Sequence, residues 1–133
     1  VDSVLADIIN DRDIDSLTRT RAVACLGFYQ NKRATQLLRS IVTDPAWQKP
    51  FREAALVAIA SSMGVEALDV LKEFTRDPDA EIRLACIRGL EVMGGDQALR
   101  LLKDLQLRER EPAVIQAIDG AIRKLSRSPL EVQ

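Results

Sequence analysis

The sequence predicts an all-α protein, an α-α superhelix of about four stacked helix pairs with half repeats at the ends. Three observations predict this class. A unit of 31 to 33 residues recurs along the chain, and each half of the unit has apolar residues at the spacing of one helix face. Ala, Leu, Ile and Val dominate, with only five aromatic residues, which favours closely packed helices over strands. We therefore expect residues 1–133 to form one repeat domain, a fragment of a longer protein.

The two central segments carry the clearest repeat. Residues 52–59 and 83–90 both begin with arginine and lie 31 residues apart. The same offset relates the second helical segments, 67–74 and 98–105. Because a whole unit recurs, each unit is predicted to contain a first helix, a short turn, a second helix and a linker.

Further copies are predicted on both sides of the central pair. In the preceding copy we expect Arg21 to begin the first helix, with Gly27 at its packing position, while residues 34–41 match the second helix at an offset of 33. In the last copy, Val114 is expected in place of the arginine. Residues 1–8 repeat the second-helix pattern, so the chain is predicted to open on a half repeat.

Small residues recur at one position of the first helices, at Gly27, Ala58, Gly89 and Gly120. Glycine inside a helix costs about 1 kcal/mol relative to alanine. We therefore expect these positions to be points where a neighbouring helix contacts bare backbone. Between the helices, Asp77-Pro78 is predicted to be an N-cap followed by proline at the first helical position.

Residues 82–90, preceded by 77–79 and followed by 94–99, resemble the HEAT-like repeat of phycobilisome lyases, a HEAT/armadillo-type solenoid unit. The resemblance covers nearly all of the chain. It implies that the second helices line a concave surface, that the first helices cover the convex surface, and that the surface binds proteins. The first copy departs from the family pattern at Asn31-Lys32 and the last at Val114, as suits end repeats.

The charges are balanced and interspersed, with 19 Lys plus Arg against 20 Asp plus Glu. The long-range field that steers proteins to nucleic acid or anionic membranes is therefore missing, and neither is expected as a partner. No apolar run approaches the roughly 18 residues that span a bilayer, and the first residues lack the features of a signal peptide. A cytoplasmic location is expected, and a homo-oligomer formed through the solenoid ends is left open.

No catalytic, cofactor or metal site is predicted, and the chain is expected not to be an enzyme. It has no histidine, the commonest general base and metal ligand. This absence also argues against HEAT-like hydroxylases, since resemblance to them implies His-Glu pairs. Residues 11–15 resemble the first half of a calcium loop, but Ser16 and Ala22 stand where the loop needs glycine and glutamate. A polar linker with helix-capping aspartates is expected there instead.

Arginines recur at the start of the first helices, at Arg21, Arg52 and Arg83, with Asp44 and Asp77 in the linkers before two of them. Structural ion pairs along the stack are one interpretation. An exposed ladder that binds an acidic peptide is the other, and the sequence leaves both open.

Polar positions of the second helices also form columns. Arg39, Lys72 and Lys103 form a basic column that could bind a carboxylate-rich peptide, although solvated helix faces give the same pattern. Trp47, in the linker, is either an interface anchor or a plug over the core. The candidate partner-binding residues are Gln36, Arg39, Trp47, Asp69, Lys72, Glu73, Arg100 and Lys103.

These observations favour a protein–protein interaction scaffold that binds a peptide or protein through the concave face of a short solenoid. An architectural segment of a larger protein is the first alternative. A subunit like the chromophore lyases is the second, because the resemblance keeps it open.

Overall fold

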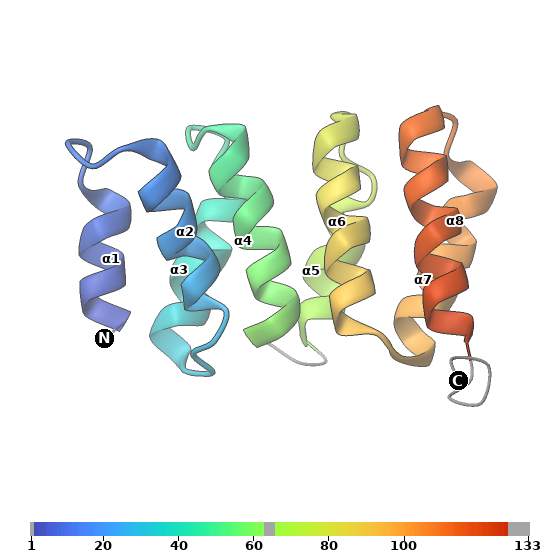
Figure 1. Cartoon of the computed structure of the whole chain (residues 1–133), viewed down its shortest axis with the longest axis horizontal. Coiled ribbons are helices and arrows are strands. Elements are labelled where there is room, and N and C mark those ends of the chain that lie inside the picture. Colours follow the sequence, from blue (N-terminus) through green and yellow to red (C-terminus); the bar gives the residue numbers. More distant parts are fainter. Residues whose placement is uncertain (1, 63–65, 128–133) are drawn as a thin grey trace.

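The computed structural model describes residues 2–62 and 66–127. The described residues form a row of helices without a strand (Figure 1). The helices are α1 (Asp2–Asn10), α2 (Ser16–Leu26), α3 (Lys32–Thr43), α4 (Lys49–Ser62), α5 (Glu66–Phe74), α6 (Ala80–Met93), α7 (Gly95–Arg108) and α8 (Pro112–Ser126). The predicted all-α stack of helix pairs is confirmed. Within these residues no helix is long and apolar enough to cross a bilayer.

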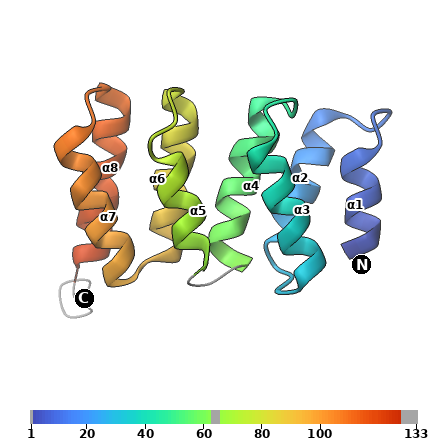
Figure 2. The ribbon, with the colours of Figure 1, turned by 180° about the vertical axis from the view of Figure 1, so that it is seen from behind.

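The helices form two layers. One layer lies nearer the viewer in Figure 1 and contains α2, α4, α6 and α8. The other lies nearer the viewer in Figure 2, the opposite view, and contains α1, α3, α5 and α7. Successive helices alternate in direction, so the linkers lie alternately at the two edges of the stack. Helix α1 belongs to the same layer as the second helices of the later units, as the predicted opening half repeat requires.

The two layers differ in how closely their helices approach. Neighbours in the layer of α2, α4, α6 and α8 pack along much of their length, whereas α3 and α5 make no close backbone approach in the described residues. That the second helices line a concave side, as the family resemblance implies, stays a prediction.

Bare backbone explains part of the close approach. A Cβ added at Gly27 would lie 3.0 Å from the carbonyl oxygen of Ala58, and one at Gly89 would lie 3.1 Å from Cδ2 of Leu71. These positions are contact points, as predicted. Gly120 differs, because an added Cβ would meet nothing within 4 Å, so the prediction is wrong for the last helix.

The register of the first helices also differs from the prediction. The buried residues of α2 are Ala22, Val23 and Leu26, and they match buried Ala55, Leu56 and Ile59 of α4. This offset is 33 rather than 31, so the residue that corresponds to Arg52 is Arg19. Phe28, which follows Gly27, is 84% exposed. In the last copy, buried Val114 matches buried Ile82, not the arginine.

Short polar side chains begin several of the helices. Asp15 accepts a hydrogen bond from the backbone nitrogen of Thr18 and so caps α2, which confirms the predicted role of the first polar linker. The hydroxyl and backbone of Thr18 together lower the pKa of Asp15. Helix α6 is capped by Asp79, one residue beyond Pro78, so the predicted Asp77-Pro78 cap is wrong. Asp77 instead accepts a hydrogen bond from the backbone of Asp79.

Candidate functional site

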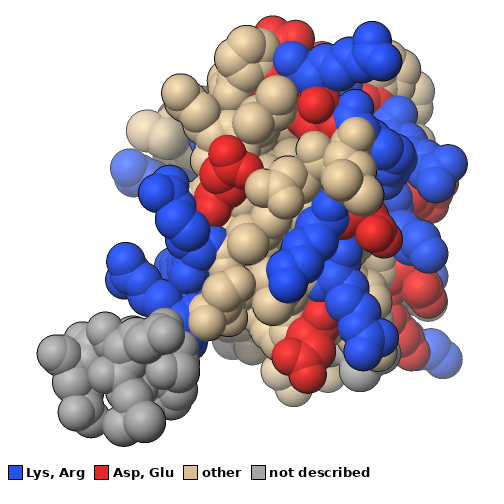
Figure 3. Space-filling model, turned by 90° about the vertical axis from the view of Figure 1, so that its right-hand side faces the viewer, with Lys and Arg blue, Asp and Glu red and all other residues tan. Residues whose placement is uncertain are grey.

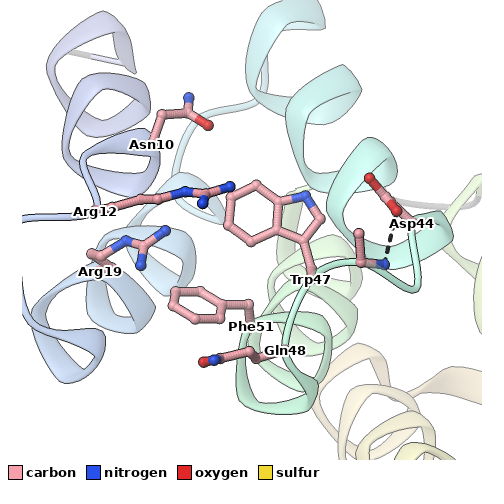
Figure 4. Close-up of a pocket in the computed structure, with 8 residues that line it drawn as sticks. Asn10, Arg12, Arg19, Asp44, Trp47, Gln48 and Phe51 are labelled. Atoms are coloured by element: carbon pink, nitrogen blue, oxygen red, sulfur yellow. Dashed lines mark hydrogen bonds between the residues drawn. The ribbon is translucent and has the colours of Figure 1, made fainter.

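One edge of the stack carries a pocket where the linkers 11–15 and 44–48 lie near each other (Figure 4). We call this region the N-terminal crossing. The pocket has a volume of about 500 Å³. Its lining residues are Asn10, Arg12, Arg19, Asp44, Ala46, Trp47, Gln48 and Phe51.

Arg19 is fixed at the floor of this pocket by two contacts. Its Nε donates a hydrogen bond of 2.9 Å to the carbonyl oxygen of Ile9, at the end of α1. Its guanidinium carbon lies 4.8 Å from the ring centroid of buried Phe51, within the range of a cation–π contact. Within the described residues its two Nη atoms make no hydrogen bond, so they can still donate to a ligand.

Trp47 forms one wall of the pocket. Its ring centroid lies 5.4 Å from that of Phe51, with the planes tilted by 56°. The side chain is half-buried, so Trp47 both covers Phe51 and presents indole surface to the pocket. The exposed side chain of Arg12 extends toward this indole from the other linker (Figure 4).

The opposite end of the stack carries a second meeting of linkers, 75–79 with 109–111, which we call the C-terminal crossing. Here Arg83 donates from Nε to Oε2 of Glu109 at 2.9 Å and from Nη2 to Oε1 at 3.0 Å. Its Nη1 donates to the backbone carbonyls of Asp77 and Pro78. The side chains of Arg83 and Glu109 are 19% and 8% exposed, so this is a largely buried bidentate ion pair.

The pKa values reflect this pairing. Burial acts to raise the pKa of Glu109, but the hydrogen bonds from Arg83 and from the following backbone outweigh it and lower the pKa. The hydrogen bond to Glu109 raises the pKa of Arg83. Both groups therefore stay charged across the neutral range.

The arginine column is structural, but its membership differs from the prediction. Arg52 donates from Nε to the carbonyl oxygen of Val42 at 3.2 Å, as Arg19 does to Ile9. Arg21 is exposed and lies outside this column. The expected side-chain pairs with Asp44 and Asp77 are absent from the described residues, because Asp44 accepts from the backbone of Ala46 and Asp77 from that of Asp79.

The candidate residues on the second helices lie on exposed helix faces and form no joint pocket. Within the described residues none of them takes part in an ion pair. The exposed candidates are Gln36, Arg39, Asp69, Lys72, Glu73, Arg100 and Lys103. Figure 3 shows basic and acidic side chains interspersed at the C-terminal end of the stack, in keeping with the balanced composition.

An ion-pair network that was not predicted joins the start of α4 to the start of α6. Lys49 lies 2.7 Å from a carboxylate oxygen of Asp79 and 3.7 Å from one of Glu81. The hydrogen bond between Lys49 and Asp79 raises the pKa of the lysine and lowers that of the aspartate. Nearby, burial and then the charge of Glu81 raise the pKa of Glu53. Within residues 2–62 and 66–127, no three His, Cys, Asp or Glu side chains form a group that could hold a metal ion.

Two layers of antiparallel helices, linked at alternating edges and held by Arg19, Arg52 and Arg83 in three successive units, define a helical-repeat protein. The family described as HEAT repeats matches residues 47–123, more than half of the chain, and the chain belongs to that family. The chain is also similar to deoxyhypusine hydroxylase of Bos taurus, with 30% identity over an alignment of 94 residues. The alignment covers 66% of this chain and 31% of the bovine protein, so the chain spans about a third of that relative.

This similarity contradicts the prediction that the chain is not an enzyme, because the bovine relative is one by name. The argument against the hydroxylases is overturned by the same finding. The chain lacks the histidines on which the exclusion of the hydroxylases rested, and it is nevertheless similar to one of them over 94 residues.

Proposed function

We propose that this chain is a helical-repeat scaffold that binds a protein or peptide partner through the exposed faces of α3, α5 and α7. One observation carries the proposal. Arg39, Lys72 and Lys103 occupy the same repeat position on the three helices, each is exposed, and none forms an ion pair within the described residues.

The scaffold suits such binding because helices fix the spacing of the three basic groups before a partner arrives. Preorganised groups lose less conformational freedom on binding, so more of the interaction energy appears as affinity. Asp69 and Glu73 stand beside Lys72 on α5 and would repel a uniformly acidic chain. We therefore expect a partner surface with acidic groups facing the basic column and basic groups facing Asp69 and Glu73.

The test compares two triple variants with the same change in charge. The first is Arg39→Glu/Lys72→Glu/Lys103→Glu, and the matched control reverses three exposed arginines of the other layer, Arg21, Arg88 and Arg123. Partners captured from lysate by the wild type are purified and their affinity is measured for each variant. We expect the first variant to lose binding by tenfold or more and the control to retain it. Retained binding in the first variant, or equal loss in both, would contradict the proposal.

The similarity to the bovine enzyme favours a second candidate, a part in the hydroxylation of deoxyhypusine. The two candidates are compatible, because a repeat scaffold can hold a protein substrate. Mass spectrometry of a deoxyhypusine-containing protein incubated with the chain, dioxygen and a two-electron reductant tests this candidate. A gain of one oxygen atom that depends on the chain would support it, and an unchanged mass would count against activity in this segment.

A further inference from the structure

We propose that the N-terminal crossing is a second binding site, specific for a peptide carboxylate, formed by Arg12, Arg19 and Trp47. The inference shares with the proposed function only the premise that the partner is a peptide or protein. The residues involved lie on the linkers and on α2, not on the exposed faces of α3, α5 and α7.

The charge of the pocket is suited to one negative group. Arg12 and Arg19 contribute two guanidinium groups, and Asp44 contributes one carboxylate that already accepts a hydrogen bond from the backbone of Ala46. Figure 4 shows both guanidinium groups directed toward the two aromatic rings and the carboxylate of Asp44 lying beyond the indole. The pocket therefore carries an excess of one positive charge.

The C-terminal crossing shows how this repeat position binds a carboxylate. There Glu109, from the next linker along the stack, binds Arg83 through two hydrogen bonds. Arg19 has the same place in its own unit, but the next linker brings Trp47 and Gln48 toward it rather than a glutamate. The Nε of Arg19 is bonded to Ile9, so an incoming carboxylate would meet the Nη atoms.

The surroundings favour a carboxylate over phosphate. Asp11 and Asp13 flank Arg12 in the linker, and Asp44 lines the pocket itself. These charges repel the two charges of a phosphate dianion in the pocket more strongly than the single charge of one glutamate carboxylate at the same point. The indole of Trp47 offers apolar surface for the methylene groups of a glutamate, and the amides of Asn10 and Gln48 can hydrogen-bond a peptide backbone.

Trp47 is the single tryptophan of the chain, so its fluorescence reports on this pocket directly. The full chain is titrated with an acetylated and amidated tetraglutamate peptide and with the matched tetraglutamine peptide. We expect a saturable change in emission with the first peptide alone. Arg12→Gln should weaken this binding by about tenfold, since a hydrogen bond to a charged group is lost. The control Arg21→Gln, an exposed arginine of α2 outside the pocket, should bind as the wild type does.

Three results would overturn the proposal. The first is an absence of binding by both fluorescence and calorimetry, and the second is an equal response to tetraglutamine. The third is a response to inorganic phosphate at concentrations where the glutamate peptide has none, which would assign the site to phosphate. A trialanine peptide with a free or an amidated C-terminus distinguishes a terminal carboxylate from a side-chain one.

The two proposed binding sites can be tested independently of each other. The Arg39→Glu/Lys72→Glu/Lys103→Glu variant should keep its fluorescence response to tetraglutamate, and Arg12→Gln should keep its affinity for a partner bound on α3, α5 and α7. Loss of the tetraglutamate response in the triple variant, with the fold intact by circular dichroism, would place the carboxylate on the helix faces instead.

Discussion

The N-terminal and C-terminal crossings place an arginine at the same point of the repeat in two electrostatic settings. At the C-terminal crossing, Arg83 is bound by the carboxylate of Glu109 and by two backbone carbonyls. At the N-terminal crossing, Arg19 binds one carbonyl and lies over Phe51 beside an open pocket. The comparison indicates that the arginine holds neighbouring helices together at both crossings. Arg83 also binds a carboxylate of the chain, whereas the Nη atoms of Arg19 can donate to a ligand.

Linker length accounts for part of the difference. Nine residues separate the buried positions Ile41 and Phe51, whereas eight separate Leu105 and Val114, which flank the corresponding linker of the C-terminal crossing. The longer connection carries Trp47 outward over Phe51 and leaves room for a pocket. The last linker has only three residues between α7 and α8 and brings Glu109 directly onto Arg83.

The largest expected effect on stability comes from truncating Phe51, the buried aromatic residue of the N-terminal crossing. Phe51 is 2% exposed and contacts both Arg19 and Trp47. Phe51→Ala should lower the free energy of unfolding by about 3 to 5 kcal/mol in urea denaturation, because a buried aromatic leaves a cavity. The control Phe28→Ala, at a residue 84% exposed, should change it by less than about 0.5 kcal/mol. Similar losses in the two variants would show that Phe51 does not support this crossing.

A smaller effect is expected from the C-terminal crossing. Glu109→Gln removes the charge that neutralises Arg83 in a largely buried pair, and should cost about 2 kcal/mol of unfolding free energy. Glu111→Gln changes the same charge at an exposed position two residues further on and should be nearly neutral. Equal stability of Glu109→Gln and Glu111→Gln would show that the Arg83–Glu109 ion pair does not stabilise the C-terminal crossing.

The same pair predicts a pH dependence. The pKa of Glu109 is lowered in the folded state, so its contribution to stability is present above the unfolded pKa of about 4.3 and is lost as pH falls through the folded pKa. The wild type should therefore lose more stability between about pH 5 and pH 3 than Glu109→Gln. Asp15 and Asp79, whose pKa values are also lowered, occur in both proteins and cancel from the difference. Parallel curves for the two proteins would contradict the assignment.

The smallest effect is expected at Arg12. Its side chain is exposed and makes no hydrogen bond within the described residues, so Arg12→Gln should leave the free energy of unfolding within about 0.5 kcal/mol of the wild type. Arg83→Gln should cost more than Glu109→Gln, because it breaks the same pair and also removes the hydrogen bonds to the carbonyls of Asp77 and Pro78. A large loss of stability in Arg12→Gln would make Arg12 a structural residue rather than a binding one.

The sequence was sufficient for the helix pairs and for the second-helix register, where large residues such as Leu38, Leu71 and Leu102 recur at one buried position. It was insufficient for the first helices. Residues 22–27 fit the offsets of 31 and 33 to α4 about equally. Only packing against α4 selects the offset of 33, which places Arg19 in the arginine column. The spacing of the two layers is likewise a property of the assembled stack, because it depends on which helices approach each other along their length.

The site was less accessible to sequence reasoning. Of its residues, only Trp47 was singled out as a candidate for partner binding, because it is the one tryptophan and lies in a linker. Arg12 and Arg19 belong to one unit and Phe51 to the next, and the paths of two linkers bring them together. Glu109 has no counterpart in the other units, so no repeat pattern indicated that it binds Arg83.

The most direct test of the account is a ¹⁵N–¹H NMR titration of the labelled chain with the blocked tetraglutamate peptide. The account predicts shifts at the indole Nε1–H of Trp47 and at the backbone amides of residues 11–19, with none at residues 109–111, where Arg83 already holds a carboxylate. Shifts of equal size at the two crossings, or shifts confined to α3, α5 and α7, would contradict the claim that the open crossing is the carboxylate site.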